Sequence, residues 1–183
     1  MASATAARFH PVDLIIRDAG QADHPRAARL LSLAYAEYLR FGDEEPGWIE
    51  YISNEVPDIS SRRDDTLIVA ENGSGEILAC VTYVGPGRSP VTKQGLPVEW
   101  AVIRLLAVDP GARGLGLGRS LAEECISRAR RDGARVVGLH TVPEMEVAHG
   151  LYERMGFVRD PRYDQVSGRV RILAFGLDLD HES

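Results

Sequence analysis

The sequence contains only two cysteines and no long apolar run. Cys80 and Cys125 lie in apolar segments without the paired spacing of a disulfide framework or a zinc site, so we expect buried thiols, a reducing cytoplasm and no metal. No apolar run reaches the roughly 20 residues that a membrane-spanning helix needs. Residues 1–11 also lack the apolar centre of a secretory signal. These absences favour a cytoplasmic protein with no membrane partner.

Positive charge is also scarce, because 21 Lys and Arg residues stand against 27 Asp and Glu residues, giving a formal net charge of -6. A nucleic-acid-binding protein needs a clustered positive face. The arginine cluster that the sequence does contain falls at the expected C-terminal end of a helix, where cations complement the helix dipole. Its members are Arg128, Arg130, Arg131 and Arg135. We therefore expect no nucleic-acid partner.

The hydrophobic pattern is that of an α/β protein. Apolar residues alternate or run together in the expected strands, which are 14–17, 66–70, 77–84, 98–108, 135–141, 157–159 and 169–179. They recur at helical spacing in the expected helices 23–40, 117–131 and 145–155. The alternation in the last strand changes phase at Ala174-Phe175, which predicts a β-bulge there. We expect a flexible tail over residues 1–11 and a single domain over residues 12–183.

A glycine-rich segment joins the strand that ends at Val108 to the helix that begins near Leu117. Its sequence over residues 113–119 is Arg-Gly-Leu-Gly-Leu-Gly-Arg. The glycines lack the Cβ atoms that would keep an anion away from backbone amides, and the first turn of the helix adds unpaired N–H groups. The two arginines add positive charge. The segment therefore predicts a phosphate site, although a tight turn without a ligand would have the same composition.

The spacing of these glycines distinguishes several kinds of phosphate loop. A Walker loop would carry Lys-Ser or Lys-Thr directly after Gly116, where this chain has Leu-Gly. The dinucleotide fingerprint would need a further glycine at Arg119 or at Leu121. The pattern Arg-x-x-Gly-x-Gly does fit residues 113–118. Placed between a strand and a helix, it resembles the acetyl-CoA pyrophosphate loop of the GNAT (Gcn5-related) superfamily of N-acetyltransferases.

A second signature lies about 30 residues after this loop. Residues 148–157, Ala-His-Gly-Leu-Tyr-Glu-Arg-Met-Gly-Phe, resemble the GNAT pattern Ala-x-x-Leu-Tyr-x-x-x-Gly-Phe. The resemblance implies a single α/β domain with a mixed, mostly antiparallel sheet of six or seven strands flanked by helices. It implies acetyl-CoA as cosubstrate and direct transfer of the acetyl group, in a ternary complex, to a primary amine of a small molecule or peptide. It leaves a homodimer open.

The resemblance also gives roles to individual residues. Acetyl transfer from a thioester needs a donor for the carbonyl oxygen and an acid for the leaving thiolate. By resemblance the amide of Val108 binds the carbonyl oxygen and Tyr152 supplies the proton, although a tyrosine at helical spacing is also an ordinary core residue. The cofactor-binding residues implied are Leu106, Ala107, Val108, Arg113, Gly114, Leu115, Gly116, Leu117, Gly118, Arg119, Ser120, Ala148 and Tyr152.

Two positions depart from the family pattern and leave the general base open. Val102 stands where many members carry glutamate, and Met145 stands where asparagine is common. Glu99 becomes a candidate base if a bulge changes the phase of its strand. His140 and His149 are other candidates.

The acidic segment 43–50 supplies further candidates, which are Asp43, Glu44, Glu45 and Glu50. As a rim of the acceptor site they would favour a cationic amine, and a solvated acidic linker is the alternative.

Two rival functions stay open at this point. A domain of the same fold that binds acyl-CoA without turning it over, as a sensor or structural partner, would be consistent with the missing glutamate and asparagine. Retention of Tyr152 favours an enzyme. A nicotinamide oxidoreductase is disfavoured by the missing third glycine and by the absence of an acidic residue at the end of the strand 135–141.

Overall fold

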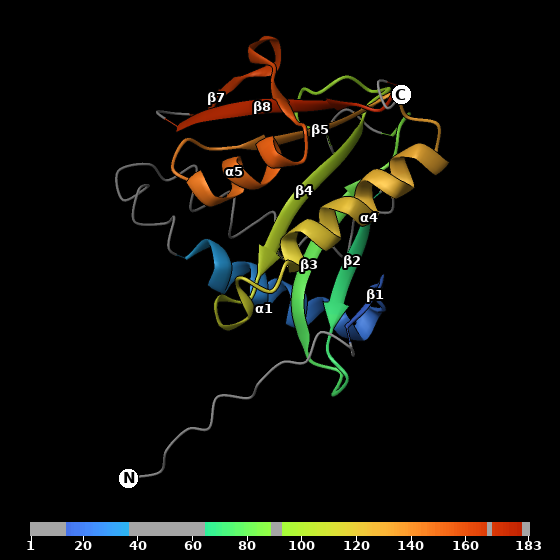
Figure 1. Cartoon of the computed structure of the whole chain (residues 1–183), viewed down its shortest axis with the longest axis vertical. Coiled ribbons are helices and arrows are strands. Elements are labelled where there is room, and N and C mark those ends of the chain that lie inside the picture. Colours follow the sequence, from blue (N-terminus) through green and yellow to red (C-terminus); the bar gives the residue numbers. More distant parts are fainter. Residues whose placement is uncertain (1–13, 37–64, 89–92, 168–169, 181–183) are drawn as a thin grey trace.

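The computed structural model describes residues 14–36, 65–88, 93–167 and 170–180, which form one sheet with helices on both faces (Figure 1). The strands are β1 (Ile15–Asp18), β2 (Asp65–Glu71), β3 (Ile77–Val84), β4 (Ala101–Val108), β5 (Val136–Thr141), β6 (Val158–Arg159), β7 (Gln165–Ser167) and β8 (Val170–Asp178). Their order across the sheet is β1-β2-β3-β4-β5-β8-β6, and β7 pairs with β8. The predicted fold class is confirmed, and the short β7 is the strand that the sequence pattern did not predict.

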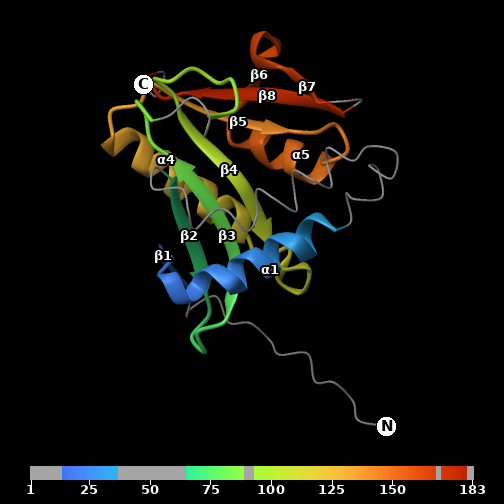
Figure 2. The same ribbon diagram turned by 180° about the vertical axis from the view of Figure 1, so that it is seen from behind.

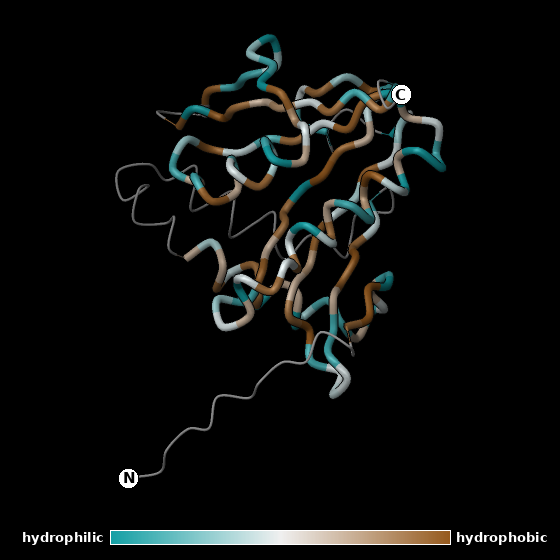
Figure 3. The backbone as a smooth tube through the Cα atoms, in the orientation of Figure 1, coloured by the Kyte–Doolittle hydropathy of each residue, from teal (hydrophilic) through white to brown (hydrophobic). Residues whose placement is uncertain are grey.

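Within the described residues, helices cover the sheet from both of its sides (Figures 1 and 2). α1 (His24–Tyr35) packs on one side, called here the α1 face. α4 (Leu117–Arg131) and α5 (Glu146–Arg154) pack on the other side, called the α4 face. The strands between them are mostly hydrophobic along their length (Figure 3). Cys80 and Cys125 are both fully buried, as predicted.

The sheet opens between its two central strands. β4 and β5 run parallel, and their pairing covers only residues 101–103 of β4 and 137–139 of β5. Beyond these residues β4 continues beside β3 to Val108, whereas β5 continues beside β8 to Thr141. The two strands therefore separate toward their C-terminal ends, on the side where β4 leads into the glycine-rich segment.

A β-bulge in β4 coincides with this separation. Its pairing with β3 is shifted, so that Leu105 and Leu106 together face the single residue Val81. Leu105 has φ of +52°, a left-handed conformation that few residues other than glycine adopt. Because a bulge bends the strand that contains it, this irregularity contributes to the divergence of β4 from β5.

The prediction of a β-bulge at Ala174-Phe175 is wrong. β5 and β8 pair without a register shift through both residues. The change of phase in the sequence instead reflects burial on both faces of β8. Ala174 packs with Val102 and Leu96 on the α1 face, whereas Phe175 belongs to the core of the α4 face.

Most of the other predicted boundaries hold. α4 spans residues 117–131 as predicted. β4 begins at Ala101 instead of residue 98, because residues 98–100 form a turn. The first helix ends at Tyr35, short of the predicted residue 40, with Ala36 as its C-cap. The acidic segment 43–50 and the tail 1–11 lie outside the described residues.

Glycines in β5 and β8 leave room for a tryptophan ring on the α1 face. Trp100 lies against Gly138 and Gly176, and a Cβ added at Gly138 would lie 2.7 Å from Trp100 Cε3. We predict that Gly138→Ala lowers the free energy of unfolding by about 1–3 kcal/mol, because the ring must leave a packed position. Urea denaturation of the wild type and the variant measures this difference.

Gly176→Ala is the matched control, since its new Cβ would lie 3.4 Å from the nearest Trp100 atoms, an ordinary contact. Alanine also restricts the unfolded chain, so this variant should keep or gain stability, by at most about 1 kcal/mol. An equal decrease in the free energy of unfolding in both variants would contradict this explanation. It would show that alanine is unfavourable at both strand positions for a reason other than contact with the Trp100 ring.

Candidate active site

The separation of β4 and β5 leaves one backbone edge of β4 without a strand partner among the described residues. Ala107 and Val108 pair with β3 on one side, and within the described residues no strand pairs with them on the side of β5. The hydroxyl of Tyr35 on α1 donates to the carbonyl oxygen of Leu106 at 3.3 Å. The predicted cofactor-binding residues 106–108 therefore lie along an edge where a ligand can bind between the two strands.

The glycine-rich segment turns from β4 into α4 next to this edge. Gly114 and Gly116 have φ of +81° and +79°, and among the described residues nothing lies within 4 Å of a Cβ built at either position. Gly116 is the N-cap of α4 and offers no side chain to the amides of the first turn. These amides and the positive end of the helix dipole can therefore bind an anion.

The two arginines of the segment, Arg113 and Arg119, are both exposed. Nε of Arg119 donates to Oε1 of Glu123 at 2.7 Å, in an ion pair whose side chains are 58% and 52% exposed. A pair this exposed is weak, so the Arg119 guanidinium can exchange Glu123 for an anionic ligand.

Gly118 is the point at which the two sequence motifs meet. A Cβ added there would lie 3.5 Å from Leu151 of α5 and 3.6 Å from both Leu106 and Val108 of β4. The start of α4, the end of β4 and the helix that carries Tyr152 therefore converge on one residue. A Cβ at residue 118 would make ordinary van der Waals contacts with all three side chains, so the elements pack directly against this position.

Tyr152 lies on α5 and is only 6% exposed. Its ring packs edge-on against Phe157, with 5.5 Å between the ring centroids. Burial raises the pKa of its hydroxyl well above the ordinary value, and the Cys125 thiol contributes in the same direction. The phenol therefore stays protonated at neutral pH and can act as a proton donor.

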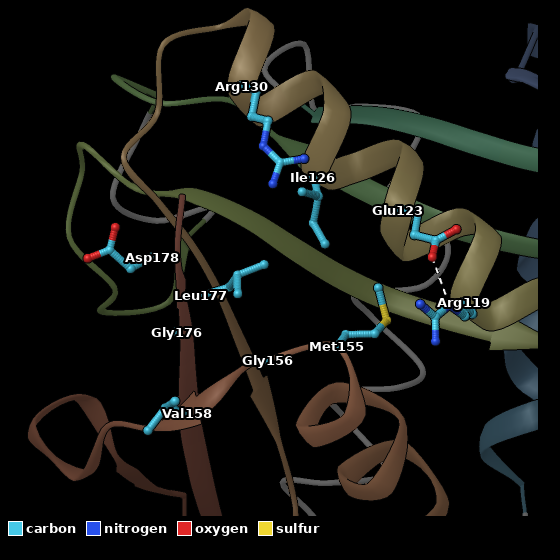
Figure 4. Close-up of a pocket in the computed structure, with 10 residues that line it drawn as sticks. All are labelled: Arg119, Glu123, Ile126, Arg130, Met155, Gly156, Val158, Gly176, Leu177 and Asp178. Carbon is cyan, nitrogen blue, oxygen red and sulfur yellow. Dashed lines mark hydrogen bonds and ion pairs between the residues drawn. The ribbon is translucent and has the colours of Figure 1, made fainter. Parts of the chain in front are cut away.

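A groove of about 680 Å³ runs along α4 from the first turn of the helix (Figure 4). Its apolar lining comes from Ile126, Met155, Val158 and Leu177. Charged side chains at its edges are Arg119, Glu123, Arg130 and Asp178. Because Arg119 belongs to the glycine-rich segment, a ligand bound at the amides of that segment would have this groove beside it.

Glu99 does not take the place of the missing glutamate. It lies exposed in the turn before β4, because the strand begins only at Ala101. The bulge at Leu105 comes after Val102 and so cannot change the phase between Glu99 and Val102. Val102 itself is buried and apolar. Met145, where asparagine is common, is a buried N-cap residue of α5 whose side chain makes no capping hydrogen bond.

The two candidate histidines lie on opposite faces of the sheet. His149 has its Nε2 atom 3.0 Å from the Val142 carbonyl oxygen and its ring beside Phe175, in the α4-face core. His140 follows Leu139, which belongs to the core of the α4 face. By strand alternation His140 therefore points to the α1 face. It lies one residue beyond the last pair between β4 and β5.

Sequence reasoning missed a buried ion pair on the α1 face. Nη1 of Arg104 lies 3.6 Å from Oδ2 of Asp65, and the two side chains are 5% and 2% exposed. Taking two charges out of water is costly. A buried ion pair of this kind is therefore weak evidence that the two residues are there to stabilise the fold. The signal that could have found it is a single charged residue, Arg104, within the otherwise apolar run of β4.

Neither cysteine has the properties of a nucleophile. Burial raises the pKa of the Cys80 thiol and of the Cys125 thiol to about 12, so both stay protonated at neutral pH. Among the residues that the structure describes, no group of three or more His, Cys, Asp or Glu side chains could hold a metal ion. In those same residues no helix has the length and apolar character needed to cross a bilayer.

Comparison with known proteins shows the family of the chain. The model of the Acetyltransferase (GNAT) family matches residues 28–157. The L-methionine sulfoximine/L-methionine sulfone acetyltransferase of Pseudomonas aeruginosa is 31% identical over 170 residues, which cover 90% of this chain and 94% of that protein. The mycothiol acetyltransferase of Cellulomonas flavigena is 39% identical over 95 residues, which cover 51% of this chain and 26% of that protein. This chain thus spans only about a quarter of that relative's length.

Solved structures show the same fold. An acetyltransferase of the GNAT family from Staphylococcus aureus superposes with a TM-score of 0.66 at 13% identity, over 91% of this chain and 99% of that one. The structure of yncA from Salmonella typhimurium, with its cofactor acetyl-CoA, superposes with a TM-score of 0.60 at 20% identity, over 93% of this chain and 96% of that one.

Proposed function

The chain belongs to the GNAT acetyltransferase family, and we propose that it transfers an acetyl group from acetyl-CoA to a primary amine of a small molecule or peptide. The observation that carries the proposal is the convergence at Gly118 of the glycine-rich segment, the end of β4 and the helix that carries Tyr152. An anion site, an open strand edge and a proton donor are three things that this transfer requires.

Residues of this chain would hold acetyl-CoA at two places. The amides of residues 114–118 would bind its pyrophosphate, supported by Arg113 and Arg119. The free edge of β4 at residues 106–108 would bind the pantetheine arm as a neighbouring strand would. The groove along α4 is large enough to take part of the nucleotide end.

The chemistry follows from the groups beside that edge. Acetyl-CoA supplies the thioester. The amide of Val108 would donate to its carbonyl oxygen as negative charge develops there. The hydroxyl of Tyr152 would give its proton to the leaving thiolate. The amine would attack the thioester directly, and the burial and protonation of both cysteines support this because they speak against an acetylated cysteine.

One relative suggests a class of acceptor amine. The relative from Pseudomonas aeruginosa is named for L-methionine sulfoximine and L-methionine sulfone, so amino acids of that kind belong among the candidates. A cationic acceptor stays a prediction, because the acidic residues of segment 43–50 lie outside the described residues.

A two-part experiment tests the proposed function. We expect acetyl-CoA or CoA to raise Tm, because it binds only the native state, and ATP or NADH at the same concentration to leave Tm unchanged. We then expect CoA release with at least one member of a panel of polyamines, aminoglycosides, peptides and methionine sulfoximine. A larger shift with ATP or NADH would contradict the cofactor. Binding of acetyl-CoA without turnover on any amine would favour the acyl-CoA-binding sensor or structural domain instead.

A further inference from the structure

Polar side chains gather on the α1 face at the point where β4 and β5 separate. Arg104 of β4 is paired with Asp65 of β2, and Thr82 of β3 lies opposite Arg104 in the register. On the other side of the opening, His140 of β5 points to the same face. Burying polar groups is costly unless they are paired, so a row of them beside the opening calls for an explanation.

His140 stands close to the position at which the family carries its glutamate. Val102 pairs with Gly138 across the parallel strands, and His140 lies two residues beyond Gly138 on the same face of β5. A side chain at 140 therefore projects beside the opening, one diagonal step from Val102 and toward the C-terminal ends of the strands. Residues 106–108 of β4, which pair with no strand on the β5 side within the described residues, lie at that end.

The hydrogen bond of His140 determines which ring nitrogen is a base. Its Nε2 atom lies 3.0 Å from the carbonyl oxygen of Tyr163. A carbonyl oxygen can only accept a hydrogen bond, so Nε2 must carry the hydrogen. In the neutral imidazole this leaves Nδ1 unprotonated, with a lone pair available for a proton.

Burial is the main reason why the His140 ring stays neutral at physiological pH. Burial lowers its pKa below the ordinary 6.5, and the cations Arg104 and Arg159 act in the same direction. The Tyr163 carbonyl and Asp164 oppose this shift. The effect of Asp164 is limited because both of its carboxylate oxygens bind the Arg159 guanidinium, at 2.8 and 2.6 Å.

We propose that His140 is the general base of the acetyl transfer, with Nδ1 as the atom that accepts the proton. This proposal rests on the proposed function. As the neutral amine forms its bond to the acetyl carbon, its N–H proton passes to Nδ1, the C–S bond breaks, and the thiolate takes the proton of Tyr152. His140 then releases one proton to solvent and Tyr152 recovers one, so no net proton is consumed.

The proposed acid and the proposed base lie on different faces of the sheet. Tyr152 is buried in the α4-face core, whereas His140 points to the α1 face. The acid and the base would thus act from opposite faces of the opening between β4 and β5. A base on β5 also explains how the chain can lack a carboxylate at Val102.

The first test is the pH dependence of His140→Gln, whose side-chain amide can still donate to the Tyr163 carbonyl. In the wild type kcat/KM should fall as the pH decreases through a value below 6.5, because imidazolium cannot accept a proton. The variant should lose this acidic limb and about 100-fold or more of kcat/KM, while its Tm shift with acetyl-CoA stays the same. An unchanged profile in His140→Gln, or a loss found instead in His149→Gln, would overturn the proposal.

The second test does not depend on turnover. Nitrogen-15 NMR of the histidines, assigned by comparison with His140→Gln, should show His140 as a neutral ring with hydrogen on Nε2 at pH 7. A charged ring, or hydrogen on Nδ1, would exclude His140 as the base even if the enzyme is active. If no amine in the panel is acetylated, that result contradicts the proposed function independently of His140. The NMR result still decides whether His140 is a neutral ring with hydrogen on Nε2.

Discussion

Gly116→Asp should abolish the rise in Tm that acetyl-CoA produces in the wild type. Gly116 is the N-cap of α4, and its position faces open space. The new carboxylate would lie where a phosphate should bind and would accept hydrogen bonds from the same first-turn amides. Thermal denaturation with and without acetyl-CoA measures the effect, and isothermal titration measures the loss of binding directly.

Gly75→Asp provides the matched control for this variant. Gly75 has φ of +76°, close to the +79° of Gly116, and it too has nothing within 4 Å of an added Cβ among the described residues. It lies in the turn between β2 and β3, away from α4. Both variants should lose about 1–2 kcal/mol to left-handed backbone strain, but Gly75→Asp should keep the full ligand-induced shift. A preserved shift in Gly116→Asp would place the phosphates of the ligand elsewhere.

The parts of the fold that the sequence predicted are those with a strong local signal. α4 has the predicted bounds because its apolar positions recur at helical spacing and glycines stand at both ends. The glycine-rich segment was predicted because Gly114 and Gly116 need a backbone that other residues rarely adopt. Gly118 differs from them, because its φ is not left-handed and a Cβ there would make only an ordinary contact with Leu151. Spacing alone did not separate Gly118 from the two glycines that need a left-handed backbone.

The features that escaped prediction depend on contacts between distant parts of the chain. The bulge at Leu105 cannot be recognised in the sequence. Because β4 is buried on both faces, its residues are mostly apolar on both, and there is no alternation of apolar and polar residues that a bulge could interrupt. The pair of Arg104 and Asp65 joins strands that are far apart in sequence. The tautomer of His140 depends on a backbone carbonyl, at Tyr163, whose position is fixed only by the folded chain.

Tyr152→Phe should lower kcat by about 10- to 1,000-fold and leave the affinity for acetyl-CoA nearly unchanged, because only the proton donor is removed. The ring and its contact with Phe157 remain, so the variant should fold normally. The expected loss extends below the usual range for general acid catalysis, since water can protonate the thiolate in part. Steady-state rates of CoA release measure kcat, and a rapid-mixing experiment without a burst would establish that chemistry is rate-limiting.

Tyr83→Phe separates a catalytic hydroxyl from a structural one. Tyr83 is 5% exposed and Tyr152 is 6% exposed, and both belong to the core of the α4 face. The Tyr83 hydroxyl donates to Oδ2 of Asp132 at 2.7 Å, at the far end of α4 from the glycine-rich segment. Its removal should cost about 1–3 kcal/mol of stability and leave kcat unchanged. If Tyr152→Phe behaves in the same way, with lower Tm and an undiminished kcat, then Tyr152 is a packing residue and the proton of the thiolate comes from another donor.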